Sequence, residues 1–505
     1  MATYLVYKDV VPDVESLTTA TFTGAYSASS SALALTGQSN DITSLEHNFW
    51  VSGAKRVAPD NFVFPFVSNE ISDANGNLSS VAMIRLDFSA GITSAGITLN
   101  MAGGRASEVE IKWYRDNVVT VDETFYPDAD EFIIERGVSD YDAVEIIFKS
   151  TTIPQRRVRC NSVILGIIRR LGMAVLQDVD ITAETDLAGQ TLPISTLKWT
   201  VTTRDAQLFT FQSKQPVQAF HNNTLIGEYY LETSERLTEK TYTINCTDAF
   251  GVLDGEPFNG GFYSGVSART LASQILDGMF TLTEIGDIED VLVSGVILAG
   301  TKRTALQQLF FAWGVIPVSD RNAGISIVSL STSSLMLGAD RTMPDVSVKV
   351  ENTVTEIKLT AHSYVQDANG SVTINGVKYA DTPIVHSLAN PNATSFDQTN
   401  IKEITDATLI NSSNVDDALE RLYQYYLRRS VVSAEIVWKD DVWLGDYVTQ
   451  LSGWGTGLMA YIEKMSYALS NTILVKCESR STGDSGIIVG DFFRSAEVRT
   501  GEVNA

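Results

Sequence analysis

The side chains that most often carry enzymatic chemistry are few and scattered in this chain. Its four histidines, His47, His221, His362 and His386, are far apart, and no HExxH pattern places two of them on one helix face to bind zinc. The sequence also lacks the Gly-x-Ser-x-Gly turn of serine hydrolases and the Gly-x-x-x-x-Gly-Lys loop that holds nucleotide phosphates. We therefore expect no enzyme activity, no catalytic residue and no cofactor.

Acidic side chains are plentiful, but carboxylate chemistry depends on pairs that meet in space. Glycoside hydrolysis uses two carboxylates about 5 to 10 Å apart, a separation that a sequence does not give, so a cell-wall hydrolase stays open as an alternative. Residues 73–77 and 128–131 gather oxygen-bearing side chains as calcium loops do, yet neither has the spacing and closing Glu of an EF-hand. Polar turns explain both segments, and we expect no metal.

Three aromatic residues could stack against a sugar. Trp50, Trp113 and Tyr114 are the candidate glycan-binding residues. Trp113 lies in an alternating apolar pattern, however, which favours burial in a core for that side chain.

The three cysteines, Cys160, Cys246 and Cys477, are widely separated and form no CxxC pair or metal-binding spacing. We expect them to be buried free thiols, which fits synthesis in a cytosol. The N-terminal segment shows no basic region followed by an apolar core, so no signal peptide is expected. No apolar run approaches the length that spans a bilayer.

Composition indicates a folded, acidic, multidomain protein. The chain has 505 residues, a length greater than one hydrophobic core usually supports. Hydrophobic residues make up 44% of it, which is enough to form sizeable cores. Its 61 acidic and 37 basic residues give a formal net charge of −24. Such a surface repels phosphate backbones and anionic lipids, so we expect neither general nucleic-acid binding nor membrane insertion.

Residues 1–168 show the alternation of short β-strands. In the clearest hairpin, Val109, Ile111 and Trp113 alternate with polar residues, and Asp116-Asn117 supplies the turn. Many short strands without a helical period predict a β-sandwich. The strands near residues 144–148 and 157–165 resemble the last two strands of jelly-roll modules similar to galactose-binding domains, which serve as sugar binders or as spacers.

Apolar spacing also predicts three helices. In the first, apolar residues recur four apart as far as Met279 behind a Ser267 cap. Thr301 can begin the second and Gly314 can end it, while Asn414 can cap the third. The expected helices span residues 267–280, 304–313 and 415–429.

The order of elements in residues 225–328 is the most informative feature of the chain. Two strand-like runs lead into two helices, and a strand-like run closes the segment. This order, together with the patterns of residues 301–314 and 418–429, resembles the central part of bacteriophage tail hub proteins, which phage-tail-like particles also use. The resemblance covers residues 180–482 and includes the strand patterns at residues 192–194, 197–201, 227–231 and 242–248.

The resemblance implies a mainly β, multidomain fold, in which the N-terminal jelly-roll-like β-sandwich is followed by two tail-tube-like β-barrels with inserted helices. The expected domains are residues 1–168 (sandwich), 169–260 (first barrel), 261–344 (helical insertion) and 345–482 (second barrel), with 483–505 as a tail. In the hub family three copies form a ring that joins the tail tube to the spike, and DNA passes through its lumen.

The implied function is that of a structural virion protein, a baseplate hub at the tail tip, synthesised in the host cytoplasm. Its expected partners are itself as a homotrimer, the tail tube protein, the spike or tip protein and other baseplate proteins. DNA would pass without specific binding. A receptor-binding tail protein, whose sandwich recognises host-surface carbohydrate for host cell attachment, and a tail-associated cell-wall hydrolase are the alternatives.

The function of such a ring would depend on the contacts between its subunits. Strand edges within residues 346–360 and 445–449 are the candidates, because unpaired backbone groups at a sheet edge can pair with another chain. The candidate interface residues are Val346, Val348, Val350, Leu359, Tyr447 and Val448.

Overall fold

The structure is a computed structural model, and its strands and helices fall into two compact units. It describes residues 3–12, 14–28, 66–101, 105–203, 209–330, 334–338, 340–343, 346–395, 397–451, 457–469 and 474–482. Val6–Arg170 and Asp205–Pro216 form one unit, which we call the sandwich unit. The described remainder of the chain forms the second, which we call the main unit. Strands dominate both, which confirms the predicted mainly β, multidomain fold.

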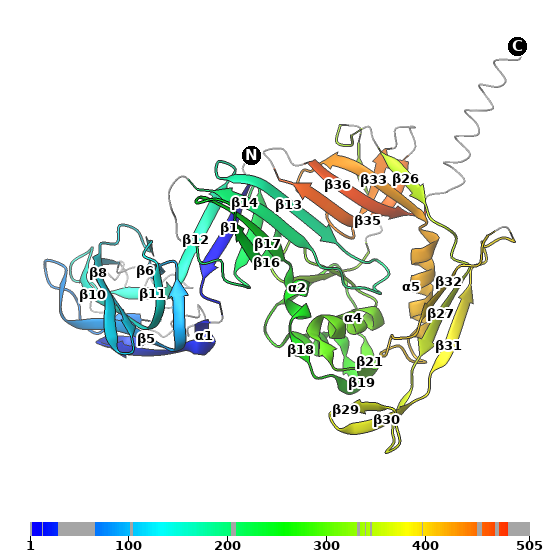
Figure 1. The fold of residues 1–505 in the computed structure, drawn as a ribbon, viewed down its shortest axis with the longest axis horizontal. Coiled ribbons are helices and arrows are strands. Elements are labelled where there is room, and N and C mark those ends of the chain that lie inside the picture. Colours follow the sequence, from blue (N-terminus) through cyan, green and yellow to red (C-terminus); the bar gives the residue numbers. More distant parts are fainter. Residues whose placement is uncertain are drawn as a thin grey trace, which may run out of the picture. The chain divides into compact units, whose positions relative to one another are not determined.

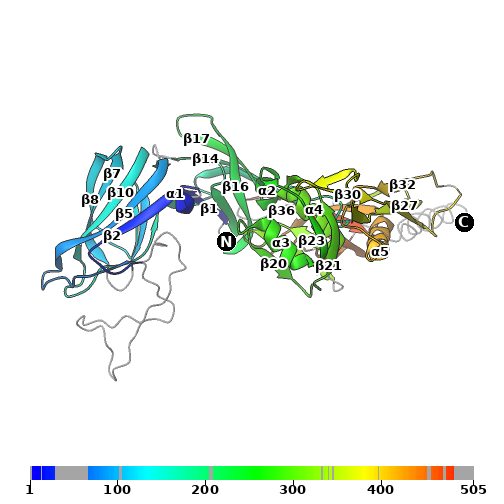
Figure 2. The ribbon, with the colours of Figure 1, turned by 90° about the horizontal axis from the view of Figure 1, so that it is seen from below.

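Two five-stranded sheets make up the sandwich unit. Figure 2 shows the strands of the first sheet side by side. In order these are β2 (Thr18–Thr23), β5 (Asn77–Ser94), β10 (Val138–Thr151), β7 (Ala106–Arg115) and β8 (Val118–Phe125). The second sheet is β3 (Ala25–Ala28), β4 (Phe66–Ser68), β11 (Arg159–Ile164), β6 (Ile97–Met101) and β9 (Glu131–Ile134), and a short helix, α1 (Val14–Leu17), precedes β2.

The predicted hairpin is the β7–β8 pair. Its turn residues Asp116 and Asn117 both have positive φ, 50° and 62°, as a tight turn between two right-twisted strands requires. On the neighbouring strand β10, Val144 lies opposite Trp113 and Ile146 opposite Ile111, and all four side chains are buried. The alternation read from the sequence therefore marks the core face of this sheet.

A single large sheet organises the main unit. Its strands run in the order β15 (Pro216–His221), β16 (Thr224–Arg236), β17 (Thr241–Thr247), β14 (Thr196–Thr202), β13 (Leu176–Glu184), β35 (Gly457–Ala468), β36 (Leu474–Ser481), β33 (Ser430–Val437) and β26 (Ser347–Val350). β34 (Tyr447–Leu451) pairs with β35, and β25 (Leu335–Leu337) pairs with β34. Two further strands, β1 (Thr3–Val10) and β12 (Gly166–Gly172), pair with each other.

The strands of the two predicted barrels meet in this sheet. β13, from the first, pairs antiparallel with β35, from the second, in a register that runs from Asp180 opposite Ala468 to Glu184 opposite Lys464. The described strands of both segments therefore share one hydrogen-bonded ladder. The finer domain boundaries within the main unit stay predictions.

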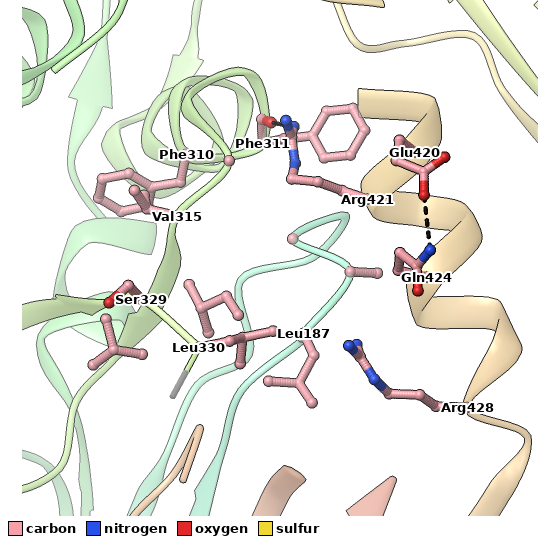
Figure 3. A pocket seen from close by; sticks show the side chains of 15 residues that line it. Leu187, Phe310, Phe311, Val315, Ser329, Leu330, Glu420, Arg421, Gln424 and Arg428 are labelled. Atoms are coloured by element: carbon pink, nitrogen blue, oxygen red, sulfur yellow. Dashed lines mark hydrogen bonds between the residues drawn. The ribbon is translucent and has the colours of Figure 1, made fainter. Parts of the chain in front are cut away.

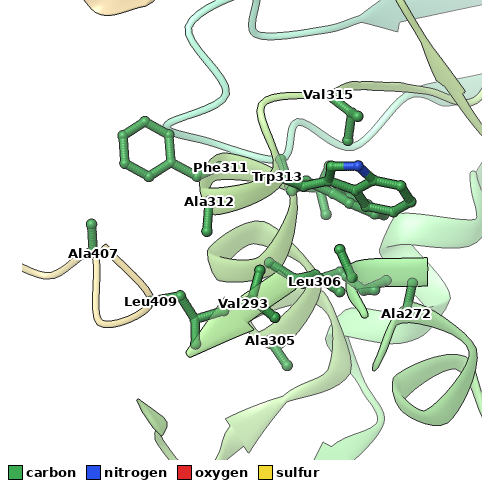
Figure 4. Close-up of a cluster of buried hydrophobic side chains, with 14 of the residues drawn as sticks. Ala272, Val293, Ala305, Leu306, Phe311, Ala312, Trp313, Val315, Ala407 and Leu409 are labelled. Atoms are coloured by element: carbon green, nitrogen blue, oxygen red, sulfur yellow. The ribbon is translucent and has the colours of Figure 1, made fainter. Parts of the chain in front are cut away.

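Three helices of the main unit pack together around an apolar core. They are α2 (Ala249–Asp254), α3 (Ala268–Leu276) and α4 (Lys302–Trp313), and Figure 4 shows Leu306 and Trp313 of α4 buried among alanine and valine side chains of neighbouring segments. Short strands connect them: β18 (Pro257–Phe258) with β22 (Gly300–Thr301), β19 (Gly261–Ser267) with β21 (Leu292–Ile297), and β20 (Leu282–Ile285) with β24 (Ile325–Val328) and β23 (Ile316–Val318).

The last helix, α5 (Val415–Leu427), packs along a separate three-stranded sheet (Figure 1). That sheet has the order β31 (Ile384–Ala389), β27 (Glu356–Ala361) and β32 (Ile401–Ile404). A second small sheet follows the order β28 (Tyr364–Gln366), β30 (Val377–Asp381) and β29 (Val372–Ile374).

Helix ends show where the sequence patterns were right and where they were wrong. The Ser267 and Thr301 hydroxyls cap α3 and α4, and Gly314 ends α4 with φ 81°, as predicted. α3 stops at Leu276, however, because Asp277 adopts the left-handed conformation, so Met279 lies outside the helix and is 37% exposed. Asn414 precedes α5 but makes no side-chain cap bond.

The three cysteines are free and buried, as predicted, and burial raises the pKa of each thiol to about 12. Such thiols are inert at neutral pH. Among the described residues, no helix is long and apolar enough to cross a membrane.

Candidate subunit interface at a strand edge

Strand β26 forms one end of the large sheet. It pairs with β33 along one side, and no described strand lies along its other side. Val350 is 45% exposed and Val348 is half-buried. A strand with one free side presents unpaired backbone groups to another chain.

The register shows which backbone groups of β26 point outward. The N–H of Glu351, directly after the strand, donates to the carbonyl of Arg429 at 2.9 Å, in line with the β26–β33 register. Hydrogen-bonded positions alternate along an antiparallel ladder, so Lys349 also faces β33. The backbone groups of Val348 and Val350 therefore face the open side, and these are two of the predicted interface residues.

The other predicted interface residues do not lie at an open edge. Leu359 is fully buried on β27, which has β31 on one side and β32 on the other. Tyr447 and Val448 belong to β34, which lies between β25 and β35. The expected edge at residues 445–449 is thus covered, because the short β25 pairs with it. Val346 lies directly before β26.

A polar cleft of about 1290 Å³ adjoins β26. Residues from the end of β26 and from α5 line it together with charged side chains of other segments. Its lining includes Lys349, Glu351, Tyr425 and Arg480.

An ion-pair cluster at the end of β26 ties the edge strand to the sheet. Arg480 on β36 places its Nη1 2.7 Å from Glu351 Oε2 and its Nε 2.7 Å from Glu463 Oε2. Its guanidinium also lies 4.9 Å from the ring centre of Tyr425 on α5. Burial raises the pKa of Glu463 to about 7, although the charge of Arg480 opposes this shift. The cluster therefore holds a carboxyl group that titrates near neutral pH.

The candidate sugar-binding residues do not form a common platform. Trp113 is fully buried in the sandwich core. Tyr114, the next residue on the same strand, faces away from that core, donates to Glu145 at 2.6 Å and has the Arg85 guanidinium over its ring. Trp50 lies outside the described residues. The burial of Trp113 is what its place in the alternating pattern favoured.

The segment at residues 73–77 is a polar turn, as predicted. The Asp73 carboxylate accepts from the backbone N–H groups of Asn75 and Asn77, both at 2.8 Å, and these bonds lower the pKa of Asp73. No group of three or more His, Cys, Asp or Glu residues that could hold a metal ion occurs in the described part of the chain.

Two buried carboxylates that the sequence reading did not single out tie loops of the main unit together. Asp248 caps α2 by accepting from Gly251 N–H, and it also accepts from Ser195 N–H at 2.8 Å. Asp320 accepts from Leu444 N–H at 2.8 Å. Burial raises the pKa of both carboxyls. The position of Asp248 between a strand and an apolar run is a sequence signal for a helix cap. The sequence around Asp320 carries no comparable signal.

Comparison with solved structures found tail proteins of low sequence identity. The chain is similar to solved structures of tail proteins. A tail protein from Neisseria meningitidis is 11% identical with a TM-score of 0.45, covering 64% of this chain and 94% of that one. The 43 kDa tail protein of prophage MuSo2 from Shewanella oneidensis is 12% identical with a TM-score of 0.42, covering 60% and 97%. A prophage tail protein from Listeria monocytogenes is 12% identical with a TM-score of 0.41, covering 66% and 96%.

No family model matches the chain, and no curated protein matches its sequence. At the identities and TM-scores above, the likeness by itself assigns no function.

Proposed function

We propose that this protein is a structural component of a phage tail or phage-tail-like particle, and that it acts as a trimeric baseplate hub at the tail tip. Its working surface is the open edge of β26, which pairs with another copy of the chain. The remaining surfaces contact the tail tube protein, the spike or tip protein and other baseplate proteins.

The observation that carries the proposal is the open edge of β26 on a sheet that contains strands from both predicted barrels. The sequence patterns of residues 180–482, which resemble tail hub proteins, supply the second line of support. The solved structures to which the chain is similar are also tail proteins, but the proposal does not depend on that similarity.

The net charge of −24 fits the same role. A ring through which DNA passes must not retain the DNA, and an acidic wall repels phosphate groups. We infer that DNA moves through the lumen without specific binding.

A proline substitution in β26 tests the edge directly. Val348→Pro removes an outward-facing N–H but no bond of the β26–β33 ladder, since the N–H of Val348 does not face β33. The matched control Val348→Thr has nearly the same shape and keeps the N–H. Sedimentation velocity should show a trimer for the unmodified protein and for the threonine variant, and a weakened trimer for the proline variant.

Thermal unfolding of each variant separates loss of pairing from loss of the fold, and Val350→Pro repeats the test at the second outward position. A chain that stays monomeric at every concentration, or a proline variant that assembles as well as the unmodified protein, would refute pairing through this edge.

Immunogold labelling of tail particles from an induced lysate tests the location. We expect gold at the tail tip. Label along the tail or on the head would contradict the hub assignment.

A further inference from the structure

A second, smaller pocket also adjoins α5. Its volume is about 290 Å³, and it is bounded by the end of α4, the loop at residues 187–189 and one face of α5 (Figure 3). Leu187, Phe310 and Val315 supply apolar walls, while Arg421 and Arg428 extend from α5 toward its interior.

Neither arginine has a carboxylate partner in the described part of the chain. Arg421 donates from Nη2 to the carbonyl of Phe311 at 2.7 Å, and Arg428 lies over the ring of Tyr461, 4.7 Å from its centre. No described Asp or Glu oxygen lies within 4.0 Å of either guanidinium. Of the five N–H groups of Arg421, one is thus used by the protein.

Both guanidinium groups are partly removed from water. Burial lowers the pKa of Arg421, opposed by the charge of Asp417, and burial also lowers the pKa of Arg428, opposed by Tyr461. Removing a charge from water is costly unless an opposite charge and hydrogen bonds compensate for it. Compensation from carboxylates is distant, from Asp417 for Arg421 and from Glu463 for Arg428, while the Tyr461 ring lies against Arg428.

We propose that this pocket binds a small ligand with two oxyanion groups, phosphate or carboxylate, through Arg421 and Arg428. Arg421 lies on α5 and Arg428 is the residue that directly follows this helix, and both line the same pocket. Planar guanidinium groups recognise phosphate and carboxylate oxygens through paired hydrogen bonds. Apolar walls on the other sides exclude water and strengthen such bonds.

One acidic side chain also lines the pocket. Glu420 is exposed and accepts a hydrogen bond from Gln424 at 2.7 Å, so its carboxylate is engaged on α5 (Figure 3). With two arginines against one glutamate, the lining keeps a net positive charge. The whole chain carries −24, which repels anions, so saturable anion binding requires a local site of this kind.

The structural role of Arg421 does not account for the pocket. Its bond to Phe311 satisfies a carbonyl in the last turn of α4, as basic side chains commonly do. That bond occupies one end of the guanidinium. Arg428 caps the end of α5 through its backbone N–H and lies over the Tyr461 ring, and neither contact uses the N–H groups of its guanidinium.

Isothermal titration calorimetry with inorganic pyrophosphate and with succinate, at constant ionic strength in a phosphate-free buffer, tests the proposal. We expect saturable binding of at least one of them with a Kd below about 1 mM and one site per chain. Pyrophosphate alone would identify a phosphate ligand, and succinate alone a carboxylate ligand. Absence of saturable binding of either would overturn the proposal.

Variants locate the binding. Arg428→Gln should weaken binding by about tenfold or more, since a charge-assisted pair of hydrogen bonds is lost. Arg269→Gln removes the same charge from an exposed position on α3 and should leave the affinity unchanged. Equal weakening by both variants, or none by the first, would also overturn the proposal.

Gln424→Glu provides a test that removes no arginine. Gln424 lines the same pocket as Arg421 and Arg428, three positions after the first and four before the second, so a carboxylate at this position can pair with either arginine. We expect the variant to fold as stably as the unmodified protein and to lose most of its anion affinity. Unchanged affinity would place the binding elsewhere. The proposal is independent of the hub function, because it concerns ligand binding by one chain.

Discussion

Replacing Glu463 by glutamine should stabilise the main unit at alkaline pH and have little effect at acidic pH. Glu463 has a folded-state pKa of about 7 against an ordinary value of 4.5, because burial penalises its charged form more than Arg480 favours it. Glutamine has nearly the same shape and carries no charge, so it removes this penalty.

The sign follows from proton binding. Below pH 4.5 the carboxyl is neutral in both the folded and the unfolded chain. As the pH rises from there to about 7, the unfolded chain releases the proton first, so the folded state loses stability relative to it. The difference between the two pKa values lowers the free energy of unfolding by roughly 3 kcal/mol at most. Of this loss, roughly 2 to 3 kcal/mol develops between about pH 5 and 8.

Differential scanning calorimetry of both proteins at these two pH values measures the effect. The advantage of Glu463→Gln over the unmodified protein should be larger at the higher pH by that amount. Glu351→Gln is the matched control, since it removes the other carboxylate that contacts Arg480 from a more exposed position. An advantage that does not change with pH would refute the reasoning. So would a larger stability of the unmodified protein at high pH, which would mean that the ion pair outweighs burial.

Three further substitutions test the packing. Asp248→Ala leaves two backbone N–H groups without their acceptor and should cost about 1 to 3 kcal/mol of unfolding free energy in urea titrations, whereas a loss under about 0.5 kcal/mol would contradict the cap. Gly314→Ala adds a Cβ at a position with φ 81°, 2.9 Å from the Arg421 guanidinium. The melting temperature of this variant should therefore fall, and an unchanged melting temperature would argue against the contact. Trp113→Ala should destabilise the sandwich unit by about 3 to 5 kcal/mol, while Tyr114→Ala costs much less, and equal costs would refute the burial difference.

Local patterns predicted local structure well. The β7–β8 hairpin follows from alternation and a two-residue turn, and the ends of α4 follow from Thr301 and Gly314, because each signal lies within a few residues of its effect. The helix α2 was missed, since six residues hold too few turns to show a period. The end of α3 was missed because Asp277 takes a left-handed conformation that glycine usually provides.

Long-range pairing could not be predicted from the sequence. β13 and β35 are almost three hundred residues apart, and neither strand carries a signal for its partner. For the same reason the sequence placed Tyr447 and Val448 at an open edge, although β25 pairs with their strand. The Arg480 cluster depends on three strands that meet only after folding, so its residues looked like ordinary surface charges.

The edge of β26 must be both open and rigid if it is to pair with another chain. A four-residue strand at the end of a sheet would fray on its own, and ordering it at the moment of association would reduce the affinity. The Glu351–Arg480 ion pair and the Glu351–Arg429 backbone bond fix its end before association. Lys349 at the same edge discourages pairing with arbitrary strands. The ion-pair cluster therefore orders β26, and the ordered β26 can pair through its open edge with another chain.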